Sequence, residues 1–116
     1  MNETLRQKQS RFLRMVARLI DQMSLLGLEG TIGDAYRDPR LHGEVGVKRG
    51  YGHPKSAHKT RLAIDINLFK DGVFVTDVTP EYTKIGEFWE SLAPDARWGG
   101  RFKDANHYSL EHDGIK

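Results

Sequence analysis

The chain has 116 residues, of which 38% are hydrophobic and 29% charged, so we expect a single folded domain spanning 1–116 rather than a disordered chain. It has no cysteine, which excludes disulfides, cysteine-bound zinc, iron–sulfur clusters and thiol nucleophiles. No apolar run approaches the roughly 18 residues of a membrane span, and residues 1–9 lack the apolar block of a signal peptide. The net charge of +2 is mild.

An amphipathic helix is predicted over residues 3–28. Its apolar positions recur with helical spacing, at Leu5, Phe12, Val16, Leu19, Ile20, Met23 and Leu26. The other face is basic and carries Arg6, Lys8, Arg11, Arg14 and Arg18. We expect Asn2 to cap the helix and Gly27 or Gly30 to end it. The N-terminal segment 1–30 should therefore pack as a helix on a sheet formed by the rest of the domain.

A short strand is predicted over 31–37, followed by a long loop over 38–57. Asp38-Pro39 interrupts regular structure, and the loop contains four glycines and two prolines. A loop of this length is uncommon in a small domain and is usually functional or mobile.

The remaining elements predict a small antiparallel sheet. Residues 62–69 alternate cleanly, which places Asp65 away from the apolar side of its strand. A turn at 70–72 leads to a returning strand over 73–78. A helix should begin at Thr79-Pro80 and end before Pro94, with a loop at 98–102 and a last strand over 107–111. This order favours the α+β class, with an antiparallel sheet flanked by helices.

Two histidines and an aspartate form the candidate chemical site. If the last strand lies beside 62–69, then His58, Asp65 and His107 converge on one open face of the sheet. Two imidazoles and one carboxylate are a ligand set for Zn²⁺ that leaves a fourth position for water, as catalytic zinc requires. Bound zinc lowers the pKa of that water to about 7, which supplies a nucleophile without serine or cysteine.

Three further residues complete the predicted site. Asp104 precedes His107 by three positions and is our candidate for the general base that moves a proton to the leaving amine. Arg37 is the candidate for binding a substrate carboxylate, because a guanidinium does so in bidentate fashion. Ser56 is expected to bind substrate or to orient a ligand.

At these residues the sequence resembles a known family. The pattern Ser-x-His-x4-Ala-x-Asp over 56–65, with a later His107, is similar to the zinc D-alanyl-D-alanine carboxypeptidases. That family includes vancomycin-resistance dipeptidases and phage endolysins that cut the L-alanyl-D-glutamate bond of peptidoglycan. The Trp98-Gly99-Gly100 segment and Asp104-x-x-His107 resemble the endolysin branch, and Tyr36-Arg37 matches the family's arginine motif.

The resemblance implies the α+β fold shared with the Hedgehog signalling domain. It also implies a zinc metallopeptidase with zinc on His58, Asp65 and His107 and with Asp104 as catalytic acid/base. The implied substrate is a peptidoglycan stem peptide, with the L-alanyl-D-glutamate endopeptidase activity of endolysins favoured. We expect a monomer made in the cytoplasm, which reaches the wall through lysis, a holin or a virion.

Three alternatives stay open. A D,D-carboxypeptidase would release terminal D-alanine from the same kind of peptide. A non-catalytic zinc domain would bind the wall or a protein partner without turnover. A nucleic-acid binder is suggested by the pI near 9.0 and the arginine-rich helix, but the mild net charge does not favour it. We expect no separate wall-binding domain in a chain of 116 residues.

Overall fold

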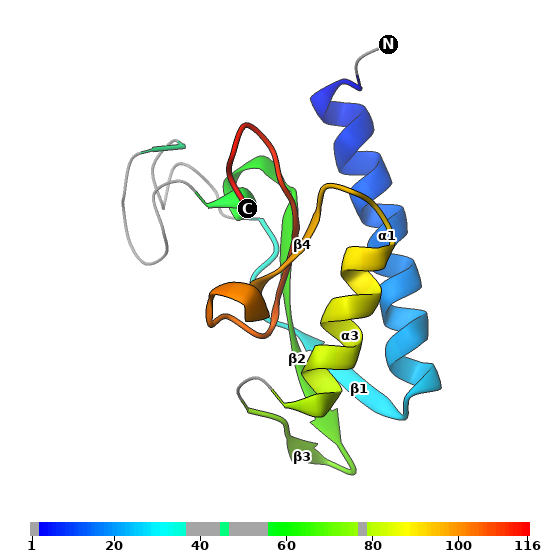
Figure 1. Ribbon diagram of the computed structural model, residues 1–116. Helices are drawn as coiled ribbons and strands as arrows, with labels where there is room; N and C mark the ends of the chain where they lie inside the picture. The colour runs from blue at the N-terminus through cyan, green and yellow to red at the C-terminus, as the bar shows by residue number, and fades with distance from the viewer. Residues whose placement is uncertain (1–2, 37–44, 47–55, 77–78) are drawn as a thin grey trace.

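Two helices and a five-stranded antiparallel sheet form the described part of the chain in this computed structural model, namely residues 3–36, 45–46, 56–76 and 79–116 (Figure 1). In chain order the elements are α1 (Leu5–Leu25), β1 (Leu28–Ile32), the 3-10 helix η1 (Ala57–Thr60), β2 (Ala63–Lys70), β3 (Val73–Phe74), α3 (Pro80–Ser91), β4 (Ala96–Trp98), the 3-10 helix η2 (Gly99–Phe102) and β5 (His107–Leu110). The predicted α+β class with a small antiparallel sheet flanked by helices is confirmed.

β2 is a central strand of the sheet, whose strand order is β1-β2-β5-β4, with β3 paired to the end of β2. β5 lies antiparallel to β2, and their register places Asp65 directly opposite His107. On the other side of β2, the β1 residue Ile32 pairs with Ile66. β2 and β5 are therefore neighbours in the sheet, as the predicted site requires.

Two strand predictions were wrong in their bounds. The strand predicted over 31–37 is β1, which begins already at Leu28 because Gly27, at a φ of 72°, ends the helical region and Leu28 pairs at once with Lys70. The strand predicted over 73–78 ends at Phe74. β4 was not predicted, since it has only three residues and forms by pairing with β5.

The hydrophobic core lies where α1 and α3 pack together against the sheet (Figure 1). Trp89 of α3 is fully buried, with its ring 5.6 Å from Phe12 of α1 and 6.1 Å from Tyr108 of β5. The Trp89 indole also donates a hydrogen bond to the Ser109 carbonyl at 3.0 Å. One aromatic cluster thus joins both helices to β5.

Polar contacts fix α1 on the domain. Thr4, rather than the predicted Asn2, is the N-cap and forms a capping box with Gln7. Arg11 forms a bidentate ion pair with Asp95, at 3.0 and 2.6 Å, in the segment after α3. Gln9 donates to the Thr60 carbonyl at 2.8 Å, so α1 also contacts η1.

Neither described helix is long and apolar enough to cross a membrane.

Candidate functional site

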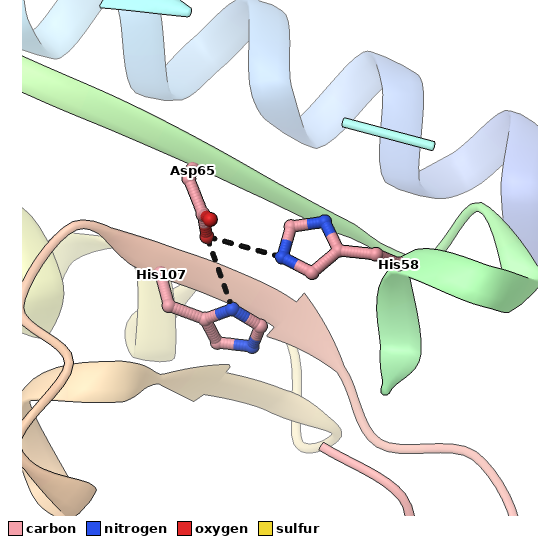
Figure 2. A group of neighbouring side chains, drawn as sticks. All are labelled: His58, Asp65 and His107. Atoms are coloured by element: carbon pink, nitrogen blue, oxygen red, sulfur yellow. Dashed lines mark hydrogen bonds and ion pairs between the residues drawn. The ribbon is translucent and has the colours of Figure 1, made fainter. Parts of the chain in front are cut away.

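The structure brings His58, Asp65 and His107 together on η1, β2 and β5 (Figure 2). His58 Nε2 lies 3.1 Å from Asp65 Oδ1, and His107 Nδ1 lies 3.2 Å from the same oxygen. One ligand-type atom from each residue falls within 4.8 Å of the others. The predicted convergence of these three side chains is therefore observed.

His58 is placed by the short helix η1. The Ser56 side chain caps η1 and accepts a hydrogen bond from the His58 backbone N–H at 3.2 Å. On the ring, Nδ1 lies 2.7 Å from the Ala35 carbonyl oxygen. Because a carbonyl can only accept, Nδ1 donates this hydrogen bond, and Nε2 faces Asp65 as the ring atom that would bind a metal ion in place of a proton.

Asp65 is held as a carboxylate. Its burial would raise the pKa, but hydrogen bonds from His107 and His58 outweigh that effect and lower the pKa to about 2. The backbone is fixed as well: Gly33 donates to the Asp65 carbonyl at 2.8 Å, and Asp65 donates to the Asp34 carbonyl at 2.6 Å. An ionised, fixed carboxylate at neutral pH is the state that a metal ligand needs.

His107 is almost fully buried at the start of β5. Phe102 of η2 packs edge-on against its ring, with the ring centroids 5.6 Å apart. Its Nε2 is buried and has no hydrogen-bond partner in the described part of the chain. Packing against Phe102 and the hydrogen bond between Nδ1 and Asp65 Oδ1 therefore fix this ring together.

Asp104 lies at the edge of the cluster. Its Oδ2 is 4.0 Å from His107 Nδ1, and its side chain is 52% exposed. The Asp104 backbone donates to the Gly99 carbonyl at 2.8 Å, and His107 donates to the Asp104 carbonyl at 3.1 Å. The acid is thus held beside the three clustered residues, with a side chain that is about half exposed.

The donor set fits a divalent metal ion. His58 Nε2 and Asp65 Oδ1 face each other at 3.1 Å, the distance of a hydrogen bond, so they need either a proton or a cation between them. Two imidazole nitrogens and one carboxylate oxygen are ligands that Zn²⁺ prefers. His58, Asp65 and His107 are therefore the residues that would hold zinc in this structure.

The other predicted site residues are not part of the cluster. Ser56 contacts it only through the backbone of His58, and its expected contact with substrate stays a prediction. Arg37 lies outside the described residues, and so do His42 and His53, which were not predicted as site residues. His112, likewise not predicted as a site residue, lies near Lys8 and Asp113.

Two backbone features of the site were missed by the sequence reasoning. The carbonyls of Asp34 and Ala35 hold Asp65 and His58, and a backbone carbonyl carries no sequence signal. Gly99 permits the turn before His107, because an added Cβ would lie 2.1 Å from the Asp104 carbonyl oxygen. The signal for this position was its place in the Trp-Gly-Gly segment.

Comparison with known proteins gives one family match. Residues 49–110, just over half of the chain, match the model of a family described as D-alanyl-D-alanine carboxypeptidase. The matched segment contains the three clustered residues and Asp104. No curated protein matches the chain.

Proposed function

The chain belongs to the D-alanyl-D-alanine carboxypeptidase family, and we propose that it is a zinc-dependent peptidase that cuts the L-alanyl-D-glutamate bond of peptidoglycan, as phage endolysins do. The observation that carries the zinc chemistry is the cluster of His58, Asp65 and His107 with Asp104 beside it. The endolysin-type bond preference is supported by the Trp98-Gly99-Gly100 segment and the Asp104-x-x-His107 spacing.

His58, Asp65 and His107 would hold the metal, each from a different element. Zinc, when bound, would lower the pKa of a water molecule to about 7 and polarise the scissile carbonyl group. Asp65 contributes an ionised carboxylate, because its pKa is lowered to about 2 despite burial. The Ala35 carbonyl keeps His58 in the tautomer whose Nε2 is a free ligand atom.

Asp104 is the proposed proton carrier. Its carboxylate is 4.0 Å from His107 Nδ1 and half-exposed, so it can reach both an attacking water and the substrate. We propose that it accepts the proton of the water as the carbonyl is attacked and then gives that proton to the leaving amine. In total the reaction consumes one water molecule and breaks one peptide bond, and the proton taken from the water ends on the leaving amine.

A D,D-carboxypeptidase is the second candidate activity, and the description of the matching family favours it. The two activities use the same residues and differ in which bond is presented to them. The endopeptidase produces a new amino terminus on D-glutamate, whereas the carboxypeptidase releases free D-alanine.

The proposal also includes how the protein acts: it reaches the wall through lysis, a holin or a virion, and it works as a monomer.

The proposal is tested by digesting purified peptidoglycan with the zinc-loaded protein and identifying the new termini. We expect new D-glutamate amino termini, loss of activity with a chelator and recovery when zinc is restored. Free D-alanine without new amino termini would replace the endopeptidase by the carboxypeptidase. Stoichiometric zinc binding without any cleavage would support the non-catalytic zinc domain instead.

Asp104→Asn tests the proton carrier. We expect this variant to bind zinc like the parent but to cleave at least about 100-fold more slowly, as is typical for loss of a general base. Asp113→Asn is the matched control, because Asp113 is an exposed acid in the C-terminal turn, away from the cluster. An Asp104→Asn variant as active as the parent would refute the assigned role.

A further inference from the structure

The segment from Gly33 to Tyr36, directly after β1, contacts two of the candidate ligands, His58 and Asp65, through its backbone. Gly33 and Asp34 exchange hydrogen bonds with the backbone of Asp65, at 2.8 and 2.6 Å. The next residue, Ala35, accepts the hydrogen bond from His58 Nδ1 at 2.7 Å. The relative position of His58 and Asp65 therefore depends on where this segment lies.

The segment ends in a contact with the turn that carries His58. The guanidinium carbon of Arg61 lies over the Tyr36 ring, 4.1 Å from its centroid, which is within the range of a cation–π contact. The Arg61 backbone N–H points back to the His58 carbonyl at 3.3 Å. Arg61 thus connects η1, which carries His58, to the residue after Ala35.

Arg61 has an unfavourable backbone for an arginine. Its φ of 59° and ψ of 31° are in the left-handed region, which glycine adopts far more readily than a residue with a Cβ. Within the described residues its guanidinium has no carboxylate partner, and Tyr36 is the aromatic ring it covers. A disfavoured backbone conformation beside a candidate ligand points to a role for the side chain that it carries.

We propose that Arg61 and Tyr36 form a clasp that keeps the Ala35 carbonyl against His58 Nδ1, and so directs His58 Nε2 toward the metal. This inference rests on the proposed function, because it assumes that His58 is a zinc ligand. Arg61 and Tyr36 are then positioning residues, which act on the metal through Ala35 and His58. Loss of such an outer partner typically lowers metal affinity by 10- to 100-fold.

Arg61→Gly separates the clasp from a merely structural role. Glycine relieves the left-handed backbone and removes the side chain, so the zinc-free variant should unfold at the same or a higher denaturant concentration than the parent. The clasp predicts that its zinc affinity nevertheless falls about tenfold, measured by competition with a chelating indicator. A structural role alone predicts that affinity and stability change together.

Further variants define the contact. Tyr36→Phe keeps the ring and should keep the parent's zinc affinity, whereas Tyr36→Ala should lose about as much as Arg61→Gly. The double variant Tyr36→Ala/Arg61→Gly should lose no more than either single one, because both remove the same contact. Asp71→Gly is the matched control, since Asp71 has a φ of 51° in the β2–β3 turn and lies outside the cluster.

A measurement on the zinc-free protein distinguishes failure of the clasp from failure of the proposed function. The His58 Nδ1 proton, observed by NMR, should exchange with solvent faster in Arg61→Gly than in the parent or in Asp71→Gly. If the parent binds no zinc, the proposed function fails, and with it the assumed role of His58, whereas the exchange rate still reports on the contact itself. Unchanged zinc affinity in Arg61→Gly and Tyr36→Ala, or an unchanged exchange rate, overturns the clasp.

Discussion

Gly99 occupies a position where no side chain fits. A Cβ there would lie 2.1 Å from the Asp104 carbonyl oxygen and 2.6 Å from the Cβ of His107. The Asp104 backbone hydrogen bond to the Gly99 carbonyl closes the same turn at 2.8 Å. The lack of a side chain at Gly99 thus serves the site, because it lets one turn hold both the proposed proton carrier, Asp104, and the candidate ligand His107.

Gly99→Ala should disturb the site and the fold together. Forcing a methyl group into this contact should lower the free energy of unfolding by about 1–3 kcal/mol, and zinc affinity should fall because His107 is displaced. Urea unfolding of the zinc-free protein and a zinc titration measure the two effects. Gly114→Ala is the control: its Cβ meets nothing within 4 Å, so it carries only the strain of a φ of +77°. Parent-like zinc affinity in Gly99→Ala would contradict this account.

The three clustered side chains were singled out by their joint pattern in the sequence, whereas their backbone partners were not. The spacing Ser-x-His-x4-Ala-x-Asp with a later His107 selects His58, Asp65 and His107 among five histidines and 16 acidic residues. These side chains come together only because β5 pairs with β2, and the sequence suggests this pairing but does not determine it. The roles of Ala35 and of the left-handed Arg61 depend on backbone conformation, which the residue names do not reveal.

At the scale of elements, α1 depends on a charged contact with the segment after α3. Hydrogen bonds from Arg11 lower the pKa of Asp95 below its ordinary value. The ionised carboxylate therefore favours the folded state. Its contribution is complete above the pKa of the unfolded chain, near 4, and is lost as the pH falls through the lower folded pKa.

Asp95→Asn should therefore reduce both stability and its acid dependence. At pH 7 we expect a loss of about 1 kcal/mol in the free energy of unfolding, since the pair is partly exposed. From pH 5 to pH 3 the variant should lose less stability than the parent, as measured by urea midpoints at each pH. Asp71→Asn serves as control, because Asp71 forms no ion pair within the described residues. A parent-like slope in Asp95→Asn would show that the pair is not coupled to folding.

The basic face predicted for α1 is smaller than its sequence suggests. Lys8 and Arg11 contact Asp95, whereas Arg6, Arg14 and Arg18 form no ion pair within the described part of the chain. These three arginines are the part of the helix that can attract the anionic polymers of a cell wall.

Charge reversal tests this attraction. Arg14→Glu/Arg18→Glu should weaken co-sedimentation with anionic cell walls several-fold at low salt. The difference should vanish in about 1 M salt, where the Debye length is about 3 Å. Lys84→Glu/Lys116→Glu changes the net charge by the same amount elsewhere and should bind more strongly than the α1 variant. Equal wall binding of the two variants would assign the effect to net charge alone.

The helices and strands predicted most accurately were those with a long periodic pattern of apolar residues. α1 and β2 were found within a few residues, since each buries a clear stripe of apolar side chains. β1 was placed too late, because its start depends on Gly27 and on pairing with β2. β4 was missed because three residues, Ala96–Trp98, are too few to show alternation.

At the scale of the whole molecule, the candidate ligands join parts of the chain that are far apart in sequence. His58 belongs to η1, Asp65 to β2 and His107 to β5, and the cluster forms only when these elements pack correctly. The unfolded chain has no such preformed site. Zinc that binds the folded state must therefore stabilise it.

The zinc-dependent stability of the parent should disappear when one ligand is removed. At a free zinc concentration about 100 times the dissociation constant, the gain is about 2.7 kcal/mol, or about 10 °C in the midpoint of thermal unfolding for a domain of this size. His107→Ala should lose most of this shift. His112→Ala should keep it, because His112 lies near Lys8, away from the cluster. Equal zinc-induced shifts in the two variants would place the metal elsewhere, since His107→Ala leaves the proposed site with only two of its three ligands, His58 and Asp65.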